Sequence, residues 1–93
     1  MNANPKTAIV IVNWNKRIDT LNLLNSLKTL NYDNYKIFVV DNSSNDGSVE
    51  AIKDQFPEAA LLINSENLGG TGGFNSGIRH VLKKGGYKYI WLL

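Results

Sequence analysis

The chain has 93 residues, of which 43% are hydrophobic and 19% are charged, a composition typical of a globular domain and not of a disordered or fibrous chain. Without cysteine it has neither disulfides nor thiolate metal sites, and a net charge of +2 is too small to indicate nucleic acid as a partner. The sequence has no signal peptide and no apolar run of membrane-spanning length, which predicts a cytoplasmic location.

Four apolar, largely β-branched runs alternate with three segments of helical spacing. The predicted strands are 7–12, 37–40, 60–63 and 87–93. The predicted helices run from 19 or 20 to about 31, from 47 to 56, and from the glycine-rich segment after residue 68 to the stop at 85–86. This alternation predicts an α/β fold, a three-layer Rossmann-like parallel sheet with right-handed crossovers. We expect strand order 3-2-1-4, with the first two helices on one face, the third on the other, and the switch point between strands one and four.

The segment from Ile37 to Gly47 carries the strongest local signal. Four apolar residues are followed directly by Asp41 and by amide and hydroxyl side chains, which predicts a buried strand that delivers a carboxylate to the ligand-binding edge of the sheet. Asp46 is a candidate cap for the next helix, whose N–H groups would face the same space. A capped structural turn that binds no ligand explains this segment, taken alone, equally well.

The glycine-rich segment 69–73 lies where the third strand gives way to the third helix. Its glycines permit close approach of the backbone to a neighbour or a ligand. They do not form a dinucleotide-binding fingerprint, because they follow the third strand and Asn75 stands where the last glycine is required. There is no phosphate-binding loop and no cluster of metal-ligand spacing. His80 is predicted to be a surface residue, and Trp14 stands at a strand end where an aromatic ring can flank a base.

The chain contains three motifs, in order and with ordinary spacing: Ile9-Val10-Ile11-Val12-Asn13-Trp14-Asn15, then Val39-Val40-Asp41-Asn42-Ser43-Ser44-Asn45-Asp46-Gly47-Ser48, then Asn67-Leu68-Gly69-Gly70 with Gly73-Phe74-Asn75-Ser76-Gly77-Ile78. Together they closely resemble family 2 glycosyltransferases of the GT-A fold, in particular the rhamnosyltransferase-like branch. The resemblance implies that residues 1–93 are the N-terminal half that binds the nucleotide-diphospho-sugar donor. It also implies an inverting transfer of sugar to an acceptor hydroxyl in polysaccharide or cell-envelope assembly.

By this resemblance, the expected donor-binding residues are Asn13, Trp14, Asn15, Asp41, Asn42, Ser43, Asn67, Gly69, Gly70 and Asn75. The residues around Asn13 and Asn15 would line the base and ribose, and Asp41 would accept the N3–H of a uracil or thymine base. The 67–75 segment would border the nucleotide. Many members of the family have an arginine where this chain has Phe74, so one contact seen in relatives is missing here.

The resemblance implies Mn²⁺ or Mg²⁺ as cofactor of the full-length enzyme, held by an Asp-x-Asp motif that would follow residue 93. The acceptor, a saccharide or a lipid-linked saccharide, and the general base would also be bound or supplied by later residues. We therefore expect no catalytic and no metal-binding residue in this chain, and no activity of the chain alone. A further expectation is association of the full enzyme with the inner face of the membrane.

Two expectations concern the isolated chain. The apolar fourth strand should be a sheet edge, which predicts self-association. The alternative to a donor-binding half is a noncatalytic, doubly wound α/β module that mediates protein contacts. Nucleotide binding distinguishes the two, because only the first has a reason to prefer uridine or thymidine diphosphates.

Overall fold

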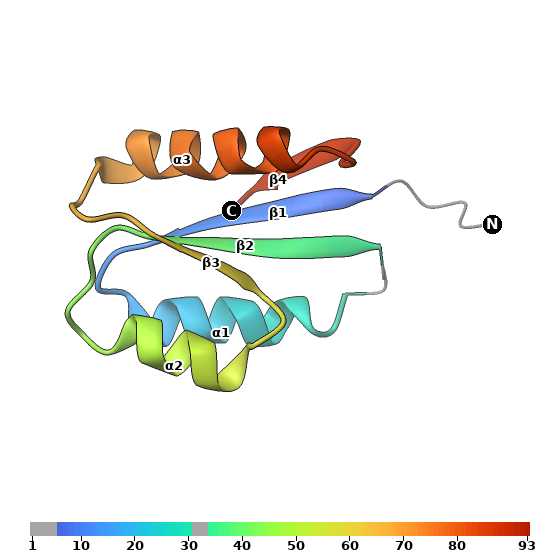
Figure 1. Ribbon diagram of the computed structural model, residues 1–93. Coiled ribbons are helices and arrows are strands. Elements are labelled where there is room, and N and C mark those ends of the chain that lie inside the picture. Colours follow the sequence, from blue (N-terminus) through green and yellow to red (C-terminus); the bar gives the residue numbers. More distant parts are fainter. Residues whose placement is uncertain (1–5, 31–33) are drawn as a thin grey trace.

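The computed structural model describes residues 6–30 and 34–93. Its elements, in chain order, are β1 (Thr7–Asn13), α1 (Arg17–Leu27), β2 (Tyr35–Asp41), α2 (Ser48–Gln55), β3 (Ala60–Ile63), α3 (Gly69–Lys84) and β4 (Tyr89–Leu92). The strands form one parallel sheet of order β3-β2-β1-β4, which confirms the predicted order. Figure 1 shows α1 and α2 on one face and α3 on the other, also as predicted.

The two faces of the sheet carry two hydrophobic clusters, because successive side chains of a strand point to opposite faces. Toward α1 and α2 lie the buried residues Ile9, Ile11, Leu24, Leu27, Val39, Ile52 and Phe56. Toward α3 lie Ala8, Val10, Phe38, Val40 and Val81. The central strands β1 and β2 are therefore buried on both sides, and their side chains contribute to both hydrophobic clusters.

The first helix differs from its predicted bounds at both ends. It begins at Arg17, two residues before the predicted start, because the carboxylate of Asp46 accepts the Arg17 N–H at 3.1 Å. It ends at Leu27, where the N–H groups of Lys28 and Thr29 bond to carbonyls three residues back and tighten the chain. The predicted end of this helix, at about residue 31, lies outside the described residues.

The glycine-rich segment belongs to α3 and not to a preceding loop. Helix α3 begins at Gly69, and a Cβ atom on Gly77 would lie 2.5 Å from Val10 Cγ1, while one on Gly73 would lie 2.7 Å from Val12 Cγ1. These two glycines therefore let α3 approach β1 more closely than any side chain would allow. The helix ends as predicted at Gly85, which has a positive φ of 71°.

Strand β4 is shorter than predicted, covering Tyr89–Leu92, and it pairs with β1 at one edge of the sheet. Tyr89, Trp91 and Leu92 are each at least 44% exposed. These three side chains are therefore largely open to solvent at the edge of the sheet. Among the described residues, no helix is long and apolar enough to cross a membrane.

Candidate functional site

The loops that follow β1, β2 and β3 meet at one end of the molecule, at the carboxyl edge of the sheet (Figure 1). In the strand register, Asn13 lies directly opposite Asp41, so the last residues of β1 and β2 are neighbours. Both side chains are fully buried. The predicted polar edge is therefore present, but its centre is inside the protein.

Asp41 is held by hydrogen bonds from its own surroundings. Asn13 Nδ2 donates to Asp41 Oδ1 at 2.7 Å, and the amide of Ser44 donates to Asp41 Oδ2 at 2.9 Å. The hydroxyl of Ser44 donates to Asp41 Oδ1, also at 2.7 Å. On the far side, Thr20 Oγ1 donates to Asn13 Oδ1 at 2.6 Å. This network joins β1, β2 and α1 with every buried polar side-chain atom of the described residues satisfied.

Ser44 also connects the loops after β1 and β2. Its hydroxyl oxygen accepts the Asn15 N–H at 2.9 Å, and Asn15 Oδ1 accepts the Asn45 N–H at 2.8 Å. Asn15 and Ser43 both have positive φ, 51° and 66°, a conformation that L-residues other than glycine rarely adopt. The reciprocal bonds between the loops hold this unusual backbone in place.

Asp46 links the first turns of both helices that cover this face. Its Oδ1 accepts the Ser48 N–H at 3.0 Å and the Ser48 hydroxyl, and its Oδ2 accepts the Arg17 N–H. The hydrogen bond from the Ser48 side chain lowers the pKa of Asp46 below its ordinary value of 3.8, and the backbone N–H groups of Arg17 and Ser48 add to this effect. The predicted capping role is thus present as an Asx turn, while Gly47, with φ of 83°, is the N-cap residue.

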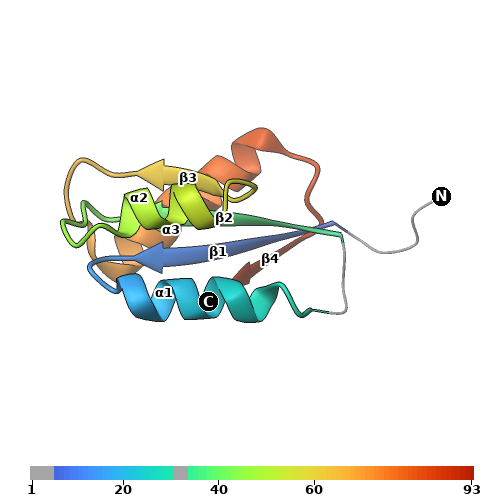
Figure 2. The ribbon, with the colours of Figure 1, turned by 90° about the horizontal axis from the view of Figure 1, so that it is seen from below.

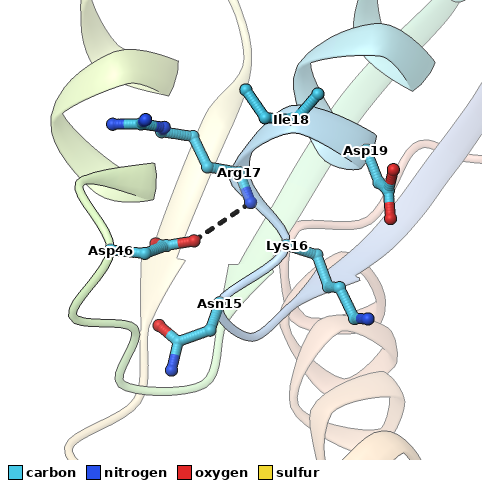
Figure 3. Close-up of a pocket in the computed structure, with 6 residues that line it drawn as sticks. All are labelled: Asn15, Lys16, Arg17, Ile18, Asp19 and Asp46. Atoms are coloured by element: carbon cyan, nitrogen blue, oxygen red, sulfur yellow. Dashed lines mark hydrogen bonds between the residues drawn. The ribbon is translucent and has the colours of Figure 1, made fainter.

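A shallow pocket of about 270 Å³ opens beside this contact, lined by Asn15, Lys16, Arg17, Ile18, Asp19 and Asp46 (Figure 3). In that view Arg17 extends toward the start of α2, while Lys16 and Asp19 project on the other side of the loop. The pocket therefore borders the loops at the edge of the sheet without including the buried carboxylate of Asp41.

Asn42 fixes the third loop. Its Nδ2 donates to the Gly69 carbonyl at 2.9 Å, and its Oδ1 accepts from Asn64 Nδ2 at 2.8 Å. Asn67 Oδ1 accepts the Gly69 N–H at 2.8 Å, and Gly69 has a positive φ of 73°. The first turn of α3 is thereby attached to the ends of β2 and β3.

The predicted site residues fall into two groups by exposure. Asn13, Asp41 and Asn42 are buried, and Asn15 is half-buried. The exposed ones are Trp14, Ser43, Asn67, Gly69, Gly70 and Asn75. Asn75 lines a separate pocket beside α3 together with Leu68, Gly72, Ser76 and Arg79, so the structure does not bring it together with Asn15.

Several residues of this edge were missed from the sequence: Thr20, Ser44, Asp46 as a link between two helices, and Asn64. For Thr20 a signal existed, because it precedes Leu24 and Leu27 at helical spacing and lies on the same buried stripe of α1. His80, predicted to be a surface residue, is half-buried and packs its ring edge-on against Phe38, with 5.7 Å between ring centroids. For the contact of Asp46 with Arg17 and that of Asn64 with Asn42 no local signal exists, since these partners lie in other segments.

The comparison with protein families decides the affiliation. The model of glycosyl transferase family 2 matches residues 8–93, almost the entire chain. The chain belongs to this family. None of the curated proteins compared with the chain matches it significantly.

Among solved structures, this family 2 chain resembles the mannosyltransferase PcManGT from Pyrobaculum calidifontis, described in complex with GDP-Man and Mn2+. The TM-score is 0.72 at 22% sequence identity, over 84% of this chain and 25% of the mannosyltransferase. This likeness shows the fold, the Rossmann-like sheet of GT-A enzymes. The chain spans about a quarter of the length of that enzyme.

Proposed function

We propose that this chain is the donor-binding half of an inverting glycosyltransferase and that it binds the nucleotide of a nucleoside-diphosphate sugar at the carboxyl edge of the sheet. Its membership in family 2 supports glycosyl transfer as the reaction class. The observation that carries the proposal is the carboxylate of Asp41, which ends β2 at this edge and has a half-buried hydroxyl, that of Ser44, as one of its hydrogen-bond donors.

Recognition of the base rests on an exchange of hydrogen-bond donors. Uracil and thymine carry an N3–H donor, whereas cytosine has a lone pair at that position, which a carboxylate repels. Because Asp41 is buried, the base N3–H reaches it only when the Ser44 hydroxyl turns away from Asp41 Oδ1. The ring of Trp14, 49% exposed, would then flank the base.

A titration of the chain with nucleoside diphosphates tests this proposal. Calorimetry or ligand-observed NMR at millimolar nucleotide would compare uridine, thymidine, cytidine and guanosine diphosphates. We expect uridine and thymidine diphosphates to bind about 10-fold to 100-fold more tightly than cytidine diphosphate, since hydrogen bonds to charged groups are worth roughly 1.5–3 kcal/mol. Equal affinities for uridine and cytidine diphosphates would remove Asp41 from the site. A preference for guanosine diphosphate would contradict the proposed uracil or thymine base, and would indicate the nucleotide named for the mannosyltransferase instead.

Asp41→Asn separates base recognition from folding better than Asp41→Ala does. Alanine would leave the donors of Asn13 and Ser44 without a partner, whereas asparagine keeps one acceptor oxygen. Asp54→Asn, on the exposed surface of α2, is the matched control for the loss of one negative charge. The preference for uridine diphosphate should vanish in Asp41→Asn and persist in Asp54→Asn, with thermal unfolding showing that both are folded.

The divalent cation expected for the full-length enzyme does not fit the residues present. Within residues 6–30 and 34–93 there is no group of three or more His, Asp or Glu side chains that could hold a metal ion. When bound, Mn²⁺ or Mg²⁺ would stabilise the charge of the leaving diphosphate. The residues of this chain bind and orient the nucleotide.

The resemblance of the three motifs supports four further proposals. They are the rhamnosyltransferase-like branch, a saccharide or lipid-linked saccharide as acceptor, a role in polysaccharide or cell-envelope assembly, and a cytoplasmic enzyme at the inner face of the membrane. A noncatalytic module for protein contacts is the alternative. It would bind no nucleoside diphosphate with base preference, so the same titration decides between the two.

A further inference from the structure

Thr20 has a hydroxyl where the packing of α1 calls for an apolar side chain. It lies on the buried stripe of α1 with Leu24 and Leu27 and is only 5% exposed. Valine has nearly the same shape as threonine and would fill this space without a polar atom. The hydroxyl therefore has its reason in its partner, Asn13 Oδ1, at 2.6 Å.

The directions of the hydrogen bonds around Asn13 follow from chemistry. A carboxylate only accepts, so Asn13 must turn its amide nitrogen toward Asp41. Its amide oxygen then faces α1, where the Thr20 hydroxyl is its donor. The same amide nitrogen donates to Ser44 Oγ at 3.1 Å. The orientation of Asn13 is thus fixed from both sides, by Asp41 and by Thr20.

The bonds continue from Thr20 to the exposed rim of the site. Asn13 contacts both Asp41 and Ser44, and Ser44 accepts the N–H of Asn15, a residue with positive φ beside the exposed ring of Trp14. Loss of the Thr20 hydroxyl would leave Asn13 Oδ1 buried without a donor, and the amide would relieve this by tilting. Tilting would move the amide nitrogen of Asn13 that donates to Asp41 and Ser44. These are the two residues proposed to exchange hydrogen-bond partners when the base binds.

We propose that Thr20 is a positioning residue of the nucleotide site, acting through Asn13 on Asp41 and Ser44. This inference rests on the proposed function, because it concerns the geometry of the same site. Thr20 has no contact with the nucleotide itself. Its role is to fix the orientation of Asn13 so that Asp41 keeps the place from which it selects a base with an N3–H donor.

The test compares Thr20→Val, which removes the hydroxyl at constant shape, with Thr20→Ser, which keeps it. Thr29→Val is the matched control, because the Thr29 hydroxyl donates to the Ser26 carbonyl on the exposed end of α1. The readout is the ratio of the dissociation constants of cytidine and uridine diphosphates, measured where thermal unfolding shows each variant to be folded. Nitrogen-15 NMR of the Asn13 side-chain amide reports its orientation.

One buried hydrogen bond corresponds to about 3-fold to 10-fold in affinity, so the ratio should fall by that factor in Thr20→Val. It should stay within about twofold of the parent in Thr20→Ser and Thr29→Val, which is below the effect of one hydrogen bond. A Thr20→Val variant that is less stable but keeps the full ratio has lost only a structural contact, and this result overturns the inference. A parent chain without base preference overturns the proposed function and with it this inference, whereas a selective parent with a selective Thr20→Val overturns the inference alone.

If Thr20→Val does not fold, the parent protein decides. The inference requires the Asn13 side-chain amide signals to move when uridine diphosphate is added, because the donors around Asp41 exchange. It also requires a Thr20 hydroxyl proton that exchanges slowly with water, as expected for a buried donor. Asn13 signals that stay fixed at a nucleotide concentration that shifts the Trp14 indole signal would overturn the inference.

Discussion

The contact between α3 and the sheet gives the sharpest test of the fold. A Cβ atom at Gly77 would lie 2.5 Å from Val10 Cγ1 and 3.1 Å from Val40 Cγ2, and both valines are fully buried in central strands. Gly77→Ala therefore forces α3 away from the sheet. Overpacking of this kind costs typically about 1–3 kcal/mol, or more where backbone must move, and the helix propensity of alanine offsets about 1 kcal/mol.

Gly70→Ala is the matched control in the same helix. A Cβ atom at Gly70 meets no atom within 4 Å, so alanine there should be neutral or stabilise by up to about 1 kcal/mol. Each kcal/mol shifts the melting temperature of a domain of this size by about 4–8 °C, which circular dichroism resolves easily. We expect Gly77→Ala to melt clearly below the parent and Gly70→Ala at or above it. If both variants melt together, α3 does not lie on the sheet as described.

Three further predictions concern the charge of Asp46, the edge strand β4 and sugar transfer by the chain alone. Asp46→Asn should destabilise the chain near neutral pH, and the difference in unfolding free energy from the parent should shrink as the pH falls below 3.8 through the lowered pKa of Asp46. A difference independent of pH would exclude an ionised Asp46 as the acceptor in the Asx turn. The parent should self-associate at high micromolar concentration in light scattering through the exposed edge strand β4; Trp91→Lys should reduce this association, and Ile18→Lys, on α1, should not. The chain alone should transfer no sugar, because no group of three or more His, Asp or Glu among its described residues could hold the cation that would stabilise a leaving diphosphate by several kcal/mol. Metal-dependent turnover by a pure sample would contradict this.

The architecture could be predicted from the sequence because local signals and long-range packing agree. β-branched runs mark the strands, and Gly85 after Lys83 and Lys84 marks the end of α3. The start of α1 could not be predicted in the same way. The acceptor for the Arg17 N–H belongs to Asp46, 29 residues further along the chain, so the helix gains two residues from a contact that no local pattern contains.

The glycine-rich segment shows why composition alone left its role open. A glycine that lets a helix touch a strand and a glycine that lets backbone touch a ligand satisfy the same requirement, the absence of a Cβ atom. In the structure, Gly73 and Gly77 meet the side chains of β1, whereas the space around Gly69 and Gly70 is open. Packing therefore accounts for the first pair, and the second pair stays in the proposed site.

The burial of the polar centre was predictable in principle. Alternation along the strands puts Asn13 on the face of Ile9 and Ile11, and Asp41 on the face of Ile37 and Val39, which is the face that α1 and α2 cover. From the residue pattern we instead expected the ends of these strands to be open to a ligand. Thr20 accounts for the burial of Asn13. It is a polar residue on the otherwise apolar stripe of α1, and it gives Asn13 a hydrogen-bond partner inside the protein.

The burial of Asp41 affects the affinity and the selectivity expected for the two bases. Under the proposed exchange, uracil replaces the Ser44 hydroxyl as a donor to Asp41, so the number of hydrogen bonds on the carboxylate is conserved and the net gain in affinity is small. Cytosine displaces the same hydroxyl but offers no donor, so it leaves a buried carboxylate with one partner fewer. The selectivity between the two bases should therefore be larger than the affinity for uracil suggests, because the cost of an unmade bond to a buried charge exceeds the gain from a replaced one.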